Sequence, residues 1–242
     1  MGGGTFAFHC LGSLCKKMKN LLDNIEGIIF DLDDTLYPQE SYKTSGFHIV
    51  SNWVASRFNL EPSSILSILE DIMEQYGPSY PFMFDRLADR MEINQELVSE
   101  MVRVFIEHEP QIQCYDGVIS MLSRLRNHYR LGILTDGRLG GQQKKISALG
   151  LDNNVDEILC SDMLGLEKPA MELYEWFEYK FQLNGENLMY VGDNPTKDFF
   201  GANLRKWSTV CVMTGENRNI VIQKMFKAQF SFASVIDLEK NM

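Results

Sequence analysis

The sequence predicts an α/β protein: a doubly wound, Rossmann-like parallel sheet with an inserted domain made only of helices. From about residue 110 onward, short apolar runs alternate with helical patterns, which is typical of a parallel sheet with helices on both faces. Between residues 41 and 109 the apolar residues follow a helical period, and no convincing strand occurs. We therefore assign residues 21–40 and 110–242 to the core and residues 41–109 to the helical insertion.

The expected elements follow from these patterns in order. The core strands are expected at Gly27–Leu32, Leu131–Thr135, Val155–Cys160, Leu188–Val191, Thr209–Met213 and Phe230–Val235. The core helices are expected at Val118–Asn127, Gly141–Leu149, Ala170–Phe181, from about Thr196, and at Asn219–Lys227. The insertion is expected to hold helices around Ile49–Phe58, from Pro62 and around Leu97–Phe105.

The composition excludes several classes of function. Of the 242 residues 45% are hydrophobic and 23% charged, as in an ordinary globular protein. The net charge of −10 argues against nucleic-acid and anionic-membrane partners, since both depend on Lys and Arg. No apolar stretch approaches the roughly 20 residues that span a bilayer. The sequence gives no indication of an oligomeric state.

Two features concern the cellular setting and the N-terminus. The five cysteines are odd in number and form no CxxC pair, which favours a reducing cytoplasm. Residues 1–20 carry no positive charge ahead of their apolar stretch, so they do not resemble a secretory signal. We expect a disordered leader or an over-extended start, with Met18 as the alternative start.

Two acidic clusters follow expected strands. Asp31, Asp33 and Asp34 come directly after the first strand, where like charges repel unless a cation lies between them. Asp193, followed by Asn194 and Asp198, comes after the strand at Leu188–Val191. Mg²⁺ suits such carboxylates, although a turn or a helix cap would explain either cluster alone.

Two further strand ends offer partners for an anion. Thr135 closes its strand, and its hydroxyl with the backbone around Asp136 and Gly137 is suited to phosphate oxygens. Lys168 lies in the loop after the next strand and supplies a compact positive charge. Ligands of parallel sheets bind beyond the carboxyl ends of the strands, where all of these residues lie.

The order of these four elements resembles the haloacid dehalogenase-like (HAD) superfamily over about residues 25 to 215. The matching motifs are Asp31-x-Asp33-x-Thr35, Thr135, Lys168 and Gly192-Asp193-x4-Asp198. The insertion between the first and second motifs resembles the C1-type cap of that family.

The resemblance implies a role for each motif residue. Asp31 would be the nucleophile that forms an aspartyl-phosphate, and Asp33 the general acid and then the base. The Asp31 side chain, the Asp33 carbonyl and the Asp193 side chain would hold Mg²⁺. Thr135, Asp136, Gly137 and Lys168 would bind phosphoryl oxygens, with Asp198 and Asn194 in support.

The resemblance also indicates the reaction and the substrate class. Family dehalogenases usually carry a non-acidic residue two places after the nucleophile, so Asp33 favours phosphate esters, whose alcohol leaving group needs a proton. We expect a small phosphorylated metabolite, such as a sugar phosphate. A phosphomutase and a catalytically inactive regulatory module are the alternatives. The residues expected to select the substrate, because a cap closes over it, are Tyr42, Lys43, Tyr80, Phe84 and Arg86. The alternative is that the aromatic residues are cap core and that Lys43 and Arg86 are solvated surface residues.

Overall fold

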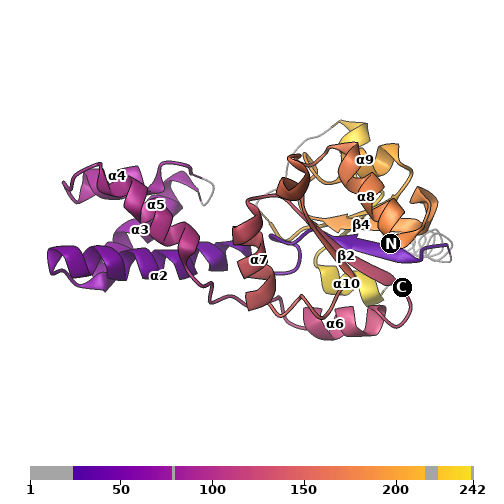
Figure 1. Ribbon diagram of the computed structural model, residues 1–242, viewed down its shortest axis with the longest axis horizontal. Helices are drawn as coiled ribbons and strands as arrows, with labels where there is room; N and C mark the ends of the chain where they lie inside the picture. The colour runs from indigo at the N-terminus through magenta and orange to yellow at the C-terminus, as the bar shows by residue number, and fades with distance from the viewer. Residues whose placement is uncertain (1–23, 78–79, 216–222, 241–242) are drawn as a thin grey trace, which may run out of the picture. The chain divides into compact units, whose positions relative to one another are not determined.

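The computed structural model describes residues 24–77, 80–215 and 223–240 (Figure 1). The chain divides into two compact units. The first comprises Met1–Pro38, Cys114–Gln142 and Gly150–Met242, and the second comprises Gln39–Gln113 and Gln143–Leu149. The prediction for residues 1–20 lies outside the described residues. In the described part of the chain, no helix is both long and apolar enough to cross a membrane.

The described residues of the first unit are built on a six-stranded parallel sheet with the strand order β3-β2-β1-β4-β5-β6. The strands are β1 (Gly27–Phe30), β2 (Arg130–Thr135), β3 (Glu157–Cys160), β4 (Leu188–Gly192), β5 (Ser208–Val212) and β6 (Phe230–Phe232). β1 and β4 are buried along their whole length, as expected for strands covered on both faces. The predicted fold class is confirmed.

Helices cover both faces of this sheet (Figure 1). α8 (Met171–Phe181) and α9 (Phe199–Leu204) lie on one face, and α6 (Val118–Leu125) and α10 (Val235–Lys240) on the other. The α8 face carries the aromatic core, in which Tyr174 packs edge-on against both Tyr190 and Trp207. On the opposite face Arg124 of α6 donates two hydrogen bonds to Glu239 of α10.

The described residues of the second unit are helical and contain no strand. The helices are α2 (Gln39–Phe58), α3 (Pro62–Tyr76), α4 (Met83–Arg90) and α5 (Leu97–Glu107). α2 packs against α3 and α5. Pro62 opens α3 at its first turn, as predicted, because a proline there forfeits no helical hydrogen bond. α4 was not expected from the sequence.

One helix belongs to both units. α7 (Leu139–Ala148) lies in the first unit as far as Gln142 and in the second from Gln143. The side chain of Lys144 donates to the carbonyl oxygens of Glu107 and His108. The Lys145 ammonium nitrogen lies 4.5 Å from the centre of the Tyr42 ring. These contacts explain why Gln143–Leu149 joins the helical unit, although the sequence had placed it in the core.

The C-terminal end of the chain departs from the sequence-based prediction. Residues 219–222 of the helix expected at Asn219–Lys227 lie outside the described part, and the described remainder forms only the short 3-10 helix η3 (Lys224–Phe226). The last strand ends at Phe232, and Val235 opens the unpredicted helix α10. The other 3-10 helices of the described chain are η1 (Ser161–Leu164) and η2 (Gly185–Asn187).

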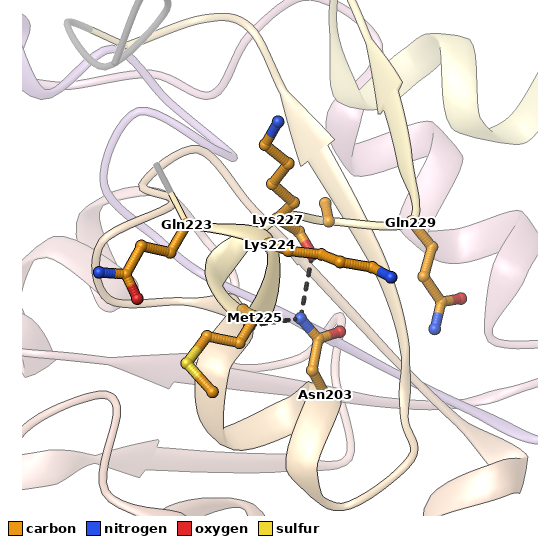
Figure 2. A pocket seen from close by; sticks show the side chains of 7 residues that line it. Asn203, Gln223, Lys224, Met225, Lys227 and Gln229 are labelled. Carbon is orange, nitrogen blue, oxygen red and sulfur yellow. Dashed lines mark hydrogen bonds between the residues drawn. The ribbon is translucent and has the colours of Figure 1, made fainter. Parts of the chain in front are cut away.

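Asn203 holds η3 against the core (Figure 2). Its side-chain nitrogen donates to the carbonyl oxygens of Met225 and Lys227, both at 3.0 Å. Its side-chain oxygen accepts from the Thr209 hydroxyl at 2.9 Å. Asn203, Met225 and Lys227 border an open hollow of about 810 Å³ on the surface, lined also by Gln223 and Gln229.

Candidate active site

Three neighbouring strands deliver the polar residues to one edge of the sheet. Phe30 of β1 pairs with Ile133 of β2 on one side and with Val191 of β4 on the other, so these strands end together. The backbone N–H of Asp31 donates to the Val191 carbonyl at 2.8 Å and extends the ladder by one residue. Asp31, Thr135 and Asp193 are all more than nine-tenths buried.

Lys168 links two of the acids. Its ammonium group lies 2.6 Å from Asp31 Oδ1 and 2.7 Å from Asp198 Oδ1. It also donates to the Tyr190 hydroxyl at 3.2 Å, which in turn donates to the Leu134 carbonyl at 3.3 Å. Lys168 comes from the loop after η1, and its own backbone N–H donates to Asp136 Oδ1 at 3.0 Å. Hydrogen bonds therefore hold Lys168 both at its backbone and at its ammonium group.

The electrostatics of this cluster follow from burial and charge. Burial favours the neutral amine, but Asp198 and Asp31 outweigh it and raise the pKa of Lys168 well above its ordinary value. Burial also raises the pKa of Asp31 well above its ordinary value; Lys168 opposes this rise, whereas Asp198 and Asp193 add to it. The pocket thus holds a permanent cation and more carboxylates than that cation can neutralise.

Asp31, Asp193 and Asp198 offer oxygens that lie within 4.8 Å of one another, and all three residues are buried. With Lys168 the four groups carry a formal charge of −2 when ionised. The donor set is made only of carboxylate oxygens, which fits a hard divalent cation and not a soft one. A cation there would favour the ionised form of Asp31.

Asp198 and Asn194 brace the loop after β4. Asp198 Oδ2 accepts the backbone N–H of Asn194 at 2.8 Å, and Asn194 Oδ1 accepts the backbone N–H of Thr196 at 3.0 Å. A Cβ on Gly192 would lie 2.3 Å from Asp198 Oδ2, so only glycine fits there. These turns delay the start of α9 to Phe199, three residues later than the sequence indicated.

Asp33 lies beside Thr135 and is held by two donors. The Tyr37 hydroxyl donates to Asp33 Oδ1, and Gln142 Nε2 donates to Asp33 Oδ2 at 3.0 Å. Gln142 Nε2 also donates to Thr135 Oγ1. Sequence reasoning missed Gln142, because one glutamine on a polar helix carries no signal of its own.

The sequence suggested phosphate binding for the loop of Asp136, but the Asp136 side chain instead interacts with two lysines. It accepts the Lys168 N–H through Oδ1 and pairs with Lys197 through Oδ2 at 3.3 Å. Gly137 has a φ of +128°, which other residues rarely adopt. The phosphate-binding role predicted for the backbone of these two residues stays a prediction.

Three of the five predicted substrate-selecting residues line one hollow in the helical unit. Lys43, Tyr80 and Phe84 border it together with Phe47 and Phe105, and its volume is about 500 Å³. Tyr42 does not line it and packs against Phe105 and His108. Arg86 also lies outside it, donating to the Tyr80 hydroxyl at 3.2 Å.

Comparison with known proteins gives a consistent family. A family model described as haloacid dehalogenase-like hydrolase matches residues 28–229. The chain is 27% identical over 205 residues to the glyceraldehyde 3-phosphate phosphatase of Methanopyrus kandleri, covering 81% of this chain and 87% of that protein. It is 26% identical over 224 residues to the protein of the same name in Methanocaldococcus jannaschii, covering 90% and 98%.

Solved structures share the fold. The putative HAD-hydrolase YfnB from Bacillus subtilis, bound to magnesium, matches with a TM-score of 0.66 at 18% identity, covering 90% of this chain and 98% of that one. A 2-haloacid dehalogenase from Pseudomonas syringae pv. Tomato matches with a TM-score of 0.61 at 21% identity, covering 90% and 97%. These likenesses show the fold alone, and the residues of the site must decide between phosphatase and dehalogenase chemistry.

Proposed function

Because the chain belongs to the haloacid dehalogenase-like hydrolase family, we propose that it is a Mg²⁺-dependent phosphatase that forms an aspartyl-phosphate on Asp31. The observation that carries the proposal is the buried Lys168 ammonium, 2.6 Å from Asp31 at the sheet edge where Asp33, Thr135 and Asp193 also lie. Hydrolysis of phosphoric monoesters is also the reaction class for which the relatives from the two methanogens are named.

Asp31 is the proposed nucleophile. It lies at the end of the central strand, where its backbone is fixed by the hydrogen bond to Val191. Attack on phosphorus by its carboxylate would release the alcohol and leave an acyl phosphate, and attack of water on that phosphorus would regenerate the carboxylate. Two displacements thus replace one difficult hydrolysis.

Asp33 is the proposed acid and base. It would give a proton to the departing alcohol oxygen and then take one from the attacking water. This residue also distinguishes the two reactions of the family, because a halide leaves without a proton. The proposal therefore favours phosphatase over dehalogenase activity.

Lys168 and Thr135 are the proposed partners of the phosphoryl oxygens. In phosphoryl transfer, positioning and neutralisation of oxygen charge supply most of the catalysis. The residues that would hold Mg²⁺ are Asp31 and Asp193 through their side chains and Asp33 through its carbonyl, with Asp198 close to them. When bound, the metal supplies further positive charge for the phosphoryl oxygens.

The substrate is proposed to be a small phosphorylated metabolite. Glyceraldehyde 3-phosphate is the first compound to test, because the relatives are named for it. The hollow beside Lys43 and Phe84 is the proposed place of substrate selection, and exchange of either residue for Ala should reorder a panel of phosphorylated metabolites. The cytoplasmic location and the absence of nucleic-acid partners remain predictions.

The test uses the full chain with p-nitrophenyl phosphate and glyceraldehyde 3-phosphate, scored by phosphate release. We expect activity with Mg²⁺, none with EDTA, and none in Asp31→Asn. Asp152→Asn is the matched control, because Asp152 is exposed and belongs to none of the motifs. Acid-quenched wild-type protein should carry one covalent phosphate by intact mass, and Asp31→Asn should carry none.

Two outcomes would count against the proposal. Activity that survives in Asp31→Asn would contradict the nucleophile assignment. Conversion of a sugar phosphate to its isomer without release of phosphate would favour the phosphomutase alternative.

A further inference from the structure

Gln142 lies between the two side chains proposed for proton transfer and phosphate binding. It is 3% exposed, on the first turns of α7, and its Nε2 donates both to Asp33 Oδ2 and to Thr135 Oγ1. The Tyr37 hydroxyl occupies the other oxygen of Asp33. Both carboxylate oxygens of Asp33 therefore accept a hydrogen bond. The neighbouring Thr135 is fully buried.

The orientation of the Gln142 amide is fixed by its partners. A carboxylate accepts hydrogen bonds and repels an amide oxygen, so the nitrogen of Gln142 must face Asp33. That nitrogen has two hydrogens, and it can direct one to each partner. Because the amide donates to Thr135 Oγ1, the hydroxyl hydrogen of Thr135 is left to point elsewhere.

We propose that Gln142 is a positioning residue for the reaction, which orients Asp33 for proton transfer and turns the Thr135 hydroxyl toward a phosphoryl oxygen. This inference rests on the proposed function. One amide thus sets two groups that act on different atoms of the substrate: Asp33 on the leaving oxygen and Thr135 on the phosphoryl group.

Gly137 supports this arrangement. A Cβ at this position would lie 3.3 Å from Gln142 Cδ, and the φ of +128° is one that glycine adopts most readily. The close approach keeps the loop after β2 tight against the amide of Gln142. Gly137 thereby lets its loop pack closely against Gln142, whose side chain contacts both Asp33 and Thr135.

The decisive measurement compares leaving groups. Departure of p-nitrophenolate needs little protonation, whereas an alkoxide needs a proton from Asp33. The kcat/KM value reports the steps up to formation of the phospho-enzyme. Gln142→Leu, which keeps the size and removes both donors, should lower kcat/KM for an alkyl phosphate by about 100-fold or more and for p-nitrophenyl phosphate by about 10-fold or less.

A second readout concerns the later step. Misplaced Asp33 would also activate water poorly, so Gln142→Leu with p-nitrophenyl phosphate should accumulate the phospho-enzyme, seen as an initial burst of nitrophenol and as a phosphate adduct by intact mass. Gln142→Asn, whose amide is too short to reach both partners, should lie between Gln142→Leu and the wild type.

Gln143→Leu is the matched control, because it makes the same exchange at the next, exposed position of α7. It should behave as the wild type with both substrates. Equal losses for the alkyl and aryl phosphates in Gln142→Leu, or equal behaviour of the two Leu variants, would overturn the inference. Failure of the wild type to hydrolyse either substrate with Mg²⁺ would instead overturn the proposed function.

Discussion

Lys168→Met removes the positive charge of the buried cluster and keeps a side chain of similar length. The ammonium group lies 2.6 Å from Asp31 and 2.7 Å from Asp198, and all three residues are buried. At an effective dielectric constant of about 20, either attraction is about 6 kcal/mol before desolvation is counted. Burial of the charges offsets much of this, and loss of one partner of a buried pair typically costs about 3–5 kcal/mol.

The variant should therefore unfold at a clearly lower temperature. For a chain of this size, 1 kcal/mol corresponds to about 2–4 °C, so the melting temperature in EDTA should fall by roughly 6–20 °C. The formal charge of the cluster changes from −2 to −3, which should strengthen the stabilising effect of Mg²⁺ on the variant. Stability should recover with Mg²⁺ and activity should not, because the proposed contact of Lys168 with the phosphoryl oxygens is gone.

The assay is thermal unfolding followed by circular dichroism, with and without Mg²⁺. Lys197→Met is the matched control: its ammonium is paired with Asp136 at 3.3 Å, but its side chain is 44% exposed. An exposed pair is worth about 1 kcal/mol or less, so this control should melt within a few degrees of the wild type. Equal melting temperatures for the two variants in EDTA, or an equal effect of Mg²⁺ on both, would refute the reasoning.

Three further changes test other parts of the structure. Gly215→Ala would place a Cβ 2.2 Å from Asp193 Oδ2, so the Mg²⁺ concentration for half-maximal activity should rise about 10- to 100-fold; Gly140→Ala, which meets nothing within 4 Å, should leave it unchanged. Burial lowers the pKa of His108 below 6.5 despite its hydrogen bond to the Phe105 carbonyl, so the stabilising contribution of neutral His108 is present above about pH 6.5 and lost as the pH falls. The melting temperature of His108→Asn should lose this part of the pH dependence. The same pH dependence in the variant and the wild type would contradict this role. Asn203→Ala should cost about 2–3 kcal/mol in urea unfolding, because it removes the two hydrogen bonds to the Met225 and Lys227 carbonyls and the one from the Thr209 hydroxyl. A loss as small as that of an exposed Asn would refute this role.

The site residues at strand ends could be predicted because the end of an apolar run in the sequence marks the end of a buried strand. The runs ending at Phe30, Thr135 and Gly192 are short, buried and parallel, so their following residues had to meet at one edge. Gln142 could not be found in this way. Its contact with Asp33 depends on the start of α7 at Leu139 and on the backbone conformation of Gly137. The periodicity of the apolar residues predicts neither feature.

The errors in the C-terminal part have a similar physical cause. The run from Phe230 to Val235 is apolar enough for a strand, but β6 is an edge strand of three residues that pairs only with β5 in the described sheet. Val235 and Leu238 instead turn toward the core from α10, which packs on α6. Such short apolar runs suit either element, and tertiary packing decides between them.

The charge of the site connects folding with function. Asp31 is distant in sequence from Asp193 and Asp198, and the folded sheet brings the oxygens of all three within 4.8 Å of one another. Lys168 neutralises one of these charges and is itself fixed through Asp136. The remaining two negative charges oppose folding in proportion to their burial, and the same two charges are what a divalent cation would neutralise. A full complement of positive side chains would stabilise the fold more and would leave no place for the metal. The observed single lysine is therefore the arrangement expected of a site in which the cation completes the charge balance and the phosphoryl group then adds its own negative charge beside it.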